Sequence, residues 1–442
     1  MIARGPIAAL AVSLALLAGS CGAEEPIRIG VITDCEALLA AFSDVALAGS
    51  ELPLLRRGAS LAGAKPADGL TGASIADRPI ELSFGCAPDA TKGSVEVRRL
   101  VEEERVDLIV GSNFPSIARA FVEYASLQPA VTFLIPEGEQ LSHLDPGLNV
   151  FRFSPTFAQQ NAGLGAYAYS ELGWRRATTI TNADSWSWGY QAAFVSEFCS
   201  LGGEIVDRVW LDTFPENVPD RLAAVPTEGV DGYYLAVDSY SAGVFLEQQS
   251  DRAVDLGSRV IAGGVSFPLD QNVAARLGDG LVGLVTGGDL PYAAPSPPFG
   301  NYVAEFERTF PELGGLAGAT AHQFDLPYHN ALEAVLRGLE AVDGDLSDGQ
   351  RRFRAALAEI ELDAPNGHIR LDAHRQAIAP TYLHQVTAND GGALSFKQLR
   401  TIENVDASFA GRLSPEGPEP SRSTPSCEPG NPPAWVSSTG EG

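Results

Sequence analysis

Lysine is scarce in this 442-residue sequence, which contains only Lys65, Lys92 and Lys397 and carries a formal net charge of −26. A surface of this sign repels phosphate backbones, so we expect no nucleic-acid partner. The acidity is compatible with a cationic ligand, although solubility outside the cell explains it more simply.

The sequence also lacks the short motifs of common enzyme classes. We find no Gly-x-Ser-x-Gly, no His-Glu-x-x-His, no Cys/His set with zinc spacing and no Gly-x-x-x-x-Gly-Lys-Ser/Thr. The six histidines are scattered, and we expect His322 and His329 to flank or cap a helix rather than bind a metal. The sequence therefore predicts neither an enzyme nor a metal or cofactor site.

Long apolar runs are missing after the N-terminus, where none approaches the roughly 20 residues that span a bilayer. The first residues are typical of an export signal, with Arg4, an apolar run over residues 7–18 and then Gly19 and Ser20 before Cys21. The run Ala-Gly-Ser-Cys at 18–21 is similar to a bacterial lipobox, in which the cysteine is lipidated. We expect a signal peptide over residues 1–21 and a membrane anchor at Cys21, with ordinary cleavage after Ala23 as the alternative.

If Cys21 carries lipid, four cysteines remain, and an exported protein would use them in two disulfides. Cys35 ends the apolar run "IRIGVITDC" and Cys86 ends "PIELSFGC". If these runs are neighbouring parallel strands, both sulfurs lie at one sheet edge, so we expect a Cys35–Cys86 bridge. Cys199 and Cys427 then either pair, which would pin the C-terminal tail to the body, or stay as free thiols.

Strand-length apolar runs recur along the chain, each followed by polar residues and a segment with helical spacing. Buried on both faces, they predict parallel strands of α/β units, with cover helices over 94–106, 162–172 and 191–201. A chain of this length, 45% hydrophobic, favours two lobes. The runs are "IRIGVIT", "IELSFG", "VDLIVGS", "AVTFLIP", "ATTITN", "GYYLAVD", "RVIAGG" and "GLVGLVT".

The segments "VEEERVDLIVGSNFPS" and "VPTEGVDGYYLAVDSYS" share a Val-Asp entry, an apolar run and a polar exit, one in each half of the chain. Chance similarity between two buried strands is the alternative to a repeated lobe. In open α/β sheets ligands bind at such strand ends, near helix N-termini. Ser112, Asn113 and Ser116 around Pro115 therefore suit a ligand carboxylate or carbonyl, unless Ser112 or Asn113 simply caps the helix.

After Ala379 the alternation in "PTYLHQVTANDGGALSFKQL" predicts an antiparallel hairpin with an Asn-Asp-Gly-Gly turn. From Leu413 onward Pro, Ser, Glu and Gly dominate. We expect that tail to be extended or poorly ordered.

The order of these pieces over residues 26–400 resembles the type I solute-binding proteins of bacterial ABC importers, in the class of the leucine/isoleucine/valine-binding proteins. The resemblance rests on "IRIGVIT", "VDLIVGS", "AVTFLIPEGEQLS", "GGEIVDRVWL", "FDLPYHNALEAVLRGLEAV" and "NGHIRLDAHRQAI". It implies a fold of two doubly wound parallel-sheet lobes joined by a multi-strand hinge. Lobe one would hold residues 26–155 plus 289–372, lobe two 156–288 plus 373–405, and 413–442 would form the tail.

The resemblance also implies an interlobe ligand site. Its residues would be Ser112, Asn113, Phe114, Glu137, Gly138 and Glu139 from lobe one, and Trp188, Asp238, Ser239, Tyr240 and Phe267 from lobe two. Relatives that bind amino acids commonly have Ser/Thr and Ala where this chain has Glu137 and Glu139, and an acid near Val265. This chain departs from that pattern, so an amine or amide with an apolar body is the expected ligand, held by ion pairing and cation–π contact.

Such a protein would capture a small polar metabolite and deliver it to the permease subunits of an ABC importer. The alternative is a sensor that uses the same clamshell to report its ligand to a membrane receptor. Genes for a permease and an ATPase beside this one would favour import, and a kinase gene would favour sensing.

Overall fold

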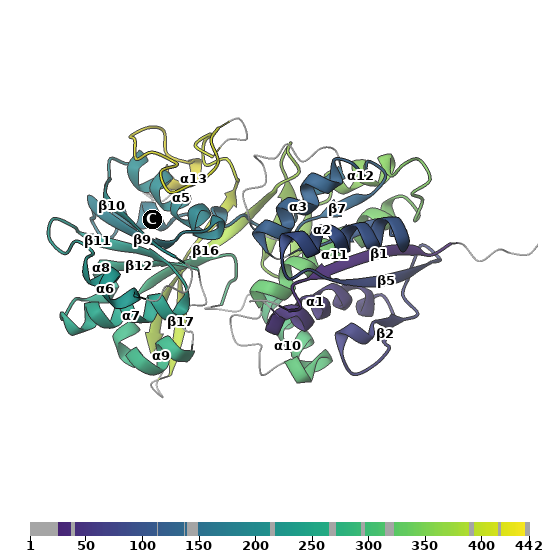
Figure 1. Cartoon of the computed structure of the whole chain (residues 1–442), viewed down its shortest axis with the longest axis horizontal. Helices are drawn as coiled ribbons and strands as arrows, with labels where there is room; N and C mark the ends of the chain where they lie inside the picture. The colour runs from purple at the N-terminus through teal and green to yellow at the C-terminus, as the bar shows by residue number, and fades with distance from the viewer. Residues whose placement is uncertain are drawn as a thin grey trace, which may run out of the picture.

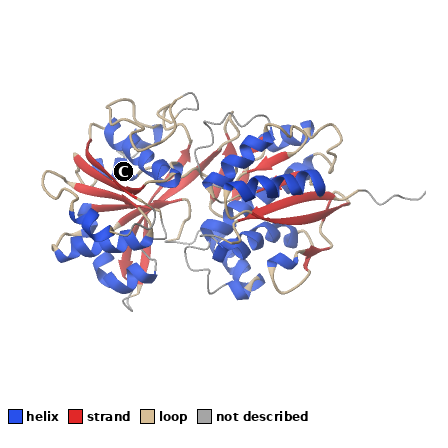
Figure 2. Cartoon of the chain, viewed as in Figure 1, coloured by secondary structure: helices blue, strands red, loops and turns tan. Residues whose placement is uncertain are grey.

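The structure is a computed structural model that describes residues 25–36, 40–112, 114–136, 138, 149–212, 217–264, 271–292, 297–313, 322–388, 393–413 and 417–437. The chain forms two α/β lobes side by side, with strands running between them (Figures 1 and 2). The predicted fold class is confirmed.

Lobe one is built on a six-stranded sheet in the order β4-β5-β1-β6-β7-β8, parallel except for β4. The predicted runs of the first half coincide with β5, β1, β6 and β7. The last three are buried on both faces, as predicted, whereas β5 is only partly buried. The strands are β4 (Ser74–Ile75), β5 (Arg78–Cys86), β1 (Ile27–Thr33), β6 (Leu108–Val110), β7 (Thr132–Leu134) and β8 (Val150–Phe151).

Helices cover both faces of this sheet. On one face α2 (Ala90–Arg98), its π-helical extension Arg99–Glu103 and α3 (Pro115–Ala125) bury residues such as Val97 and Phe121. On the other face α1 (Ser43–Arg56), α10 (Pro297–Thr309), α11 (His322–Ala341) and α12 (Arg351–Ala358) enclose two further clusters. Lobe one is therefore the three-layer sandwich of an open α/β sheet.

Lobe two repeats the plan with parallel strands in the order β10-β9-β11-β12-β13. The predicted strand "GLVGLVT" is displaced, because residues 278–281 form a 3-10 turn and β13 begins at Val285. The strands are β10 (Glu204–Leu211), β9 (Arg176–Asn182), β11 (Gly232–Ala236), β12 (Val260–Gly263) and β13 (Val285–Gly288).

Two groups of helices sandwich the second sheet. The helices α4 (Leu164–Ser170) and α5 (Ser185–Ser200) pack on one face through an aromatic cluster that includes Phe194 and Tyr234. The opposite face is covered by α6 (Val218–Ala223), α7 (Ser239–Asp251), α8 (Leu256–Arg259) and α9 (Gln271–Leu277). Each lobe thus has its own hydrophobic core.

The predicted hairpin is formed by β16 (Ala377–Ala388) and β17 (Leu394–Val405), and its predicted turn at 389–392 lies outside the described residues. β16 also pairs with β13 in lobe two and with β15 (Gly367–Leu371), which follows β14 (Leu362–Ala364). Ala377 and Ala379 are buried in the core of lobe one, whereas Leu383 and Val386 are buried in lobe two. One strand therefore contributes to both cores.

The structure pairs the four cysteines as Cys35–Cys86 and Cys199–Cys427, with Cα–Cα separations of 5.4 and 5.2 Å. Both separations fit disulfide geometry. Cys35 follows β1, and Cys86 is the last residue of β5. The two strands run parallel, with Thr33 opposite Cys86. The carboxylate of Glu36 lies near this first pair.

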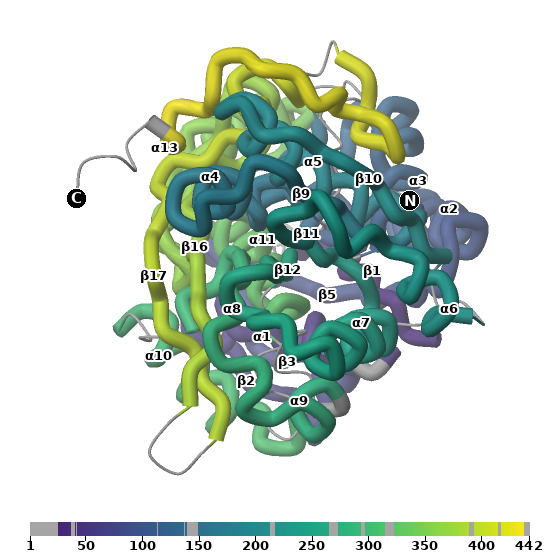
Figure 3. Tube along the Cα trace, turned by 90° about the vertical axis from the view of Figure 1, so that its left-hand side faces the viewer, coloured from purple at the N-terminus to yellow at the C-terminus, as the bar shows by residue number. Residues whose placement is uncertain are grey.

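The tail was predicted to be extended or poorly ordered; its described part, residues 417–437, has little regular structure but is packed against lobe two. Figure 3 shows it crossing above α4 and α5 before the short helix α13 (Ala434–Ser437). Trp435 and Val436 are buried there, and the Trp435 ring meets Phe409 edge to face at 5.1 Å. Among the described residues, no helix is long and apolar enough to cross a membrane.

Candidate ligand-binding cleft

The polar turns predicted to bind a ligand follow the carboxyl ends of parallel strands in both lobes. Ser112 and Phe114 follow β6 in lobe one, and Asp238 follows β11 in lobe two. At such edges helix N-termini offer backbone N–H groups to a ligand.

The turn after β6 is shaped by Gly111 and Ser112. Gly111 has φ +150°, and a Cβ there would lie 2.6 Å from the carbonyl oxygen of Ile32, so this close approach requires glycine. Ser112 is fully buried, and its Oγ accepts a hydrogen bond from the Phe114 N–H at 3.1 Å. Ser112 thus holds the turn, and α3 starts directly after it with Pro115.

The helices that follow the candidate turns begin differently in the two lobes, although α2 of lobe one also has an aspartate cap, Asp89. In lobe two, Asp184 accepts from the Ser187 N–H at the start of α5, and Asp238 accepts from the Ser241 N–H at the start of α7. In lobe one, α3 begins at Pro115 with no side-chain cap from its N-cap residue Phe114. A helix N-terminus without a carboxylate cap favours an anionic or carbonyl group from a ligand.

The Asp238 carboxylate is held by its own lobe. Besides the Ser241 N–H at 3.0 Å, it accepts from Ser241 Oγ at 2.9 Å and Asn182 Nδ2 at 3.1 Å. The Asp238 N–H in turn donates to Asn182 Oδ1 at 2.7 Å. These donors compete with a ligand ammonium for Asp238. Ser239 beside it is half-buried, and Tyr240 is 53% exposed.

Trp188 and α3 come from different lobes and line the same groove. Trp188 lies in the first turn of α5, and its groove, about 1020 Å³, is shared with Ser116, Arg119 and Ala120 of α3. The Trp188 indole N–H is buried and has no hydrogen-bond partner among the described residues. A ligand acceptor would satisfy it.

Aromatic residues that were not predicted from the sequence pack around the first turns of α5. Phe157 packs between the lobes, where its N–H donates to the Gly138 carbonyl at 2.6 Å and a Cβ on Gly189 would lie 3.0 Å from its own Cβ. Its ring meets Tyr190 edge to face at 5.3 Å, and Tyr190 meets Trp186 at 5.6 Å.

Asp289 is an acid that the sequence analysis also missed. It follows β13 directly, at the same edge of the lobe-two sheet as Asp238, and is 7% exposed. Burial raises the pKa of its carboxyl to about 6, against a hydrogen bond from its own backbone N–H. The four predicted residues Asn113, Glu137, Glu139 and Phe267, together with Cys21, lie outside the described residues.

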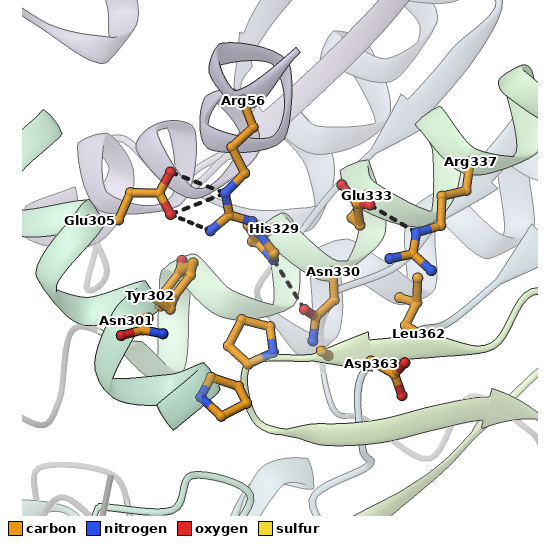
Figure 4. A pocket seen from close by; sticks show the side chains of 13 residues that line it. Arg56, Asn301, Tyr302, Glu305, His329, Asn330, Glu333, Arg337, Leu362 and Asp363 are labelled. Carbon is orange, nitrogen blue, oxygen red and sulfur yellow. Dashed lines mark hydrogen bonds and ion pairs between the residues drawn. The ribbon is translucent and has the colours of Figure 1, made fainter. Parts of the chain in front are cut away.

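A smaller cavity of about 210 Å³ in lobe one lies between α10, α11 and β14 (Figure 4). Its charged groups pair with one another: Arg56 with Glu305, and Arg337 with Glu333 at 2.8 Å. His329 Nε2 lies 2.8 Å from Arg56 Nη1, and burial with this cation lowers its pKa to about 4, so the ring is a neutral acceptor. These contacts join α1, α10 and α11. We therefore interpret the cavity as part of the helix packing of lobe one and not as a ligand site.

His322, the other histidine expected to flank or cap a helix, is the first residue of α11. Its Nδ1 lies 2.8 Å from Asp325 Oδ2, and both side chains are buried. Both histidines therefore belong to the interior of lobe one.

Comparison with known proteins extends these observations. Residues 26–393 match the sequence profile of the periplasmic binding protein family. No curated protein matched. An ABC transporter substrate-binding protein from Sphaerobacter thermophilus superimposes with a TM-score of 0.73 at 24% identity, covering 86% of this chain and 99% of that one.

Two further solved structures are similar. A solute-binding protein from Rhodopseudomonas palustris BisB5, in complex with 3,4-dihydroxybenzoic acid, gives a TM-score of 0.70 at 20% identity over 87% of this chain and 99% of that one. The leucine-binding protein LivK from Thermotoga maritima gives 0.67 at 17% identity over 85% and 99%. Because the family profile spans most of the sequence and the two lobes share this fold, the chain belongs to the periplasmic binding protein family, in its type I class.

Proposed function

We propose that this chain is an extracytoplasmic solute-binding protein that captures a small polar metabolite between its lobes and delivers it to an ABC importer. The observation that carries the proposal is the shared groove, in which Trp188 of lobe two and residues of α2 and α3 in lobe one, Ser116 among them, line one space. A ligand held by both lobes gains contacts that exist only when they approach, and that difference drives closure.

The ligand site would take one polar group at lobe one and an apolar body at lobe two. The uncapped start of α3 suits a carboxylate or carbonyl oxygen. Trp188 supplies an aromatic face and a free indole N–H. An amine or amide group on the same ligand would pair with Glu137 or with the exposed part of Asp238, completing the expected chemistry.

An aromatic carboxylate is a second candidate ligand. The Asp238 carboxylate already accepts three hydrogen bonds, and Trp188 supplies an aromatic side chain to the groove. Similar structures include proteins in complex with benzoate and with hydroxybenzoic acids. These observations favour a ligand whose negative end meets α3.

Packing gives partial support to the proposed lobe boundaries, 26–155 plus 289–372 and 156–288 plus 373–405, because Ala377 and Ala379, assigned to lobe two, are buried in the core of lobe one. Leu362 is buried with the helices of lobe one and Val386 with the sheet of lobe two. The lipid anchor at Cys21 remains part of the proposal.

Thermal unfolding against a ligand panel tests this function. The panel contains amines and amides, branched-chain amino acids, and benzoate with its hydroxy derivatives. A ligand at 100 times its dissociation constant stabilises the folded state by about 2.7 kcal/mol. We expect Trp188→Ala to abolish that stabilisation while changing the unliganded melting temperature little.

Trp210→Ala is the matched control, because Trp210 is a half-buried tryptophan of the same lobe that does not line the groove. It should leave the ligand-induced shift intact. A shift that survives in Trp188→Ala would remove Trp188 from the site, and a panel without any stabilising compound would count against small-molecule capture.

A further inference from the structure

We propose that residues 417–437, here named the strap, are a conformational device: fixed to lobe two, they hold lobe one through a Glu419–Arg119 ion pair and so stabilise the interlobe arrangement of this structure. The inference is independent of the ligand's identity. It concerns a segment beyond residues 26–393, the part that matches the family profile.

The strap is fixed firmly to lobe two. The Cys199–Cys427 disulfide joins it to α5, and Trp435 Nε1 donates to Glu197 Oε1 on the same helix at 2.8 Å. Between Glu419 and Cys427, the strap accepts hydrogen bonds from Arg208 on β10. Arg208 donates to the carbonyl oxygens of Arg422 and Pro425, at 3.2 and 2.7 Å. Covalent, aromatic and polar contacts therefore all tie the strap to one lobe.

The strap reaches the other lobe at Glu419. Its two carboxylate oxygens accept from Arg119 Nη1 and Nη2 at 3.2 and 3.4 Å, and Arg119 belongs to α3 of lobe one. The guanidinium–carboxylate pair is bidentate, the geometry in which arginine pairs are strongest. A segment bound covalently to one lobe thus makes a directional contact with the other.

Glu419 and Arg119 also line the groove that contains Trp188. A change in the distance between α3 and α5 must therefore either break this ion pair or pull the strap along. Because the disulfide holds the strap on α5, the ion pair acts as a latch between the lobes. Its strength depends on salt, since 46% of the Glu419 side chain and 32% of the Arg119 side chain are exposed.

The expected effect is modest. Exposed ion pairs contribute about 0–1 kcal/mol, which changes a two-state ratio by up to roughly fivefold. An effect of this size is measurable as a shift in population.

Double electron–electron resonance measures that population directly. Nitroxides at Leu127→Cys in lobe one and Val282→Cys in lobe two, both solvent-exposed positions, report the interlobe distance, with Cys21→Ser to prevent stray labelling. We expect Glu419→Arg to depopulate the main wild-type distance by up to about fivefold, Glu419→Gln to do so less, and 0.5 M NaCl to move the wild type the same way.

Two controls separate the latch from a local effect. Glu428→Gln changes another strap acid, which accepts from Ser426 Oγ, and should leave the distances unchanged. In a Cys199→Ser, Cys427→Ser background, Glu419→Arg should have a smaller effect, because only the Arg208 and Trp435 contacts then hold the strap on lobe two. Identical distances in wild type and Glu419→Arg would overturn the proposal, as would an equal Glu419→Arg effect with and without the disulfide.

Discussion

Among the residues that the structure describes, each lobe fully buries one glutamate in a helix beside its sheet, and the two glutamates have opposite surroundings. Glu197 on α5 of lobe two accepts four hydrogen bonds, from the backbone N–H groups of Gly163, Gly165 and Ala166 and from Trp435 Nε1, at 2.7 to 3.2 Å. Glu51 on α1 of lobe one is also fully buried, but both its carboxylate oxygens lack a partner among the described residues.

This difference shows two uses of a buried acid. Glu197 satisfies the first N–H groups of α4 and receives the tail, so it joins three segments of lobe two. Burial raises its pKa to about 7, against the lowering effect of its four donors. Burial, with the nearby charge of Asp68, raises the pKa of Glu51 to about 8. Glu51 therefore stays protonated at neutral pH. It forms no hydrogen-bond network with the described residues of lobe one.

The largest expected effect is the loss of unfolding free energy when the disulfide between the tail and lobe two is removed. Replacing Cys199 and Cys427 with serine opens a 228-residue separation, whereas the Cys35–Cys86 pair spans 51 residues. Loop-closure entropy gives about 5 kcal/mol for the first and about 4 kcal/mol for the second. Calorimetry of the two double variants should show the larger loss of unfolding free energy for Cys199→Ser, Cys427→Ser. A larger loss for the lobe-one pair would contradict the view that the tail completes lobe two.

Glu197→Ala should lower the unfolding free energy by about 3 kcal/mol, because it leaves several buried donors without an acceptor. Glu197→Gln retains one acceptor oxygen and should lose about half as much. Urea unfolding measures both, with Glu51→Ala as the matched comparison in lobe one. An equal cost at Glu51 would mean that the four hydrogen bonds of Glu197 contribute little.

The pH dependence of stability should separate the two acids. The ordinary pKa of Glu51 is about 4.5 and its folded value is about 8, so the folded state keeps a proton that the unfolded chain has already lost. This contribution is complete below pH 4.5 and is lost as the pH rises toward 8. Glu51→Gln should remove that slope and be more stable than wild type at pH 8 by about 1–3 kcal/mol.

Urea midpoints at pH 5, 6.5 and 8 measure this effect. Glu197 gives a slope of the same sign that ends near pH 7, so the difference in slope between wild type and Glu51→Gln above pH 7 reports Glu51. If wild type and Glu51→Gln fall in parallel across this range, Glu51 is not the protonated group.

The fold was predictable because its central strands are short, apolar and regularly followed by polar turns. The neighbouring positions of "IRIGVITDC" and "PIELSFGC" also led to the Cys35–Cys86 pair, since parallel strands end at one edge. β13 was placed too early because "GLVGLVT" is apolar throughout, and apolarity alone does not distinguish a 3-10 turn from a strand.

The candidate site was less predictable from the sequence. The role of Asp238 as the α7 cap depends on Asn182, which lies 56 residues away. Phe157 approaches Gly138 and Gly189 only in three dimensions. The tail has the composition of a disordered segment, yet Cys427 and Trp435 anchor it to lobe two. Because the composition is averaged over the whole segment, it does not reveal single anchoring residues.

The strand β16 limits how the molecule can move, because its first residues lie in one core and its last in the other. Sliding of one lobe past the other would pull that strand out of a core, so we expect the lobes to open by rotation about it. Its pairing with β17 is irregular between Ala379 and Thr381, around Pro380, which has no N–H to donate. We expect this interruption to act as the hinge. On opening, the β16–β17 ribbon would bend there while the two cores move as rigid bodies.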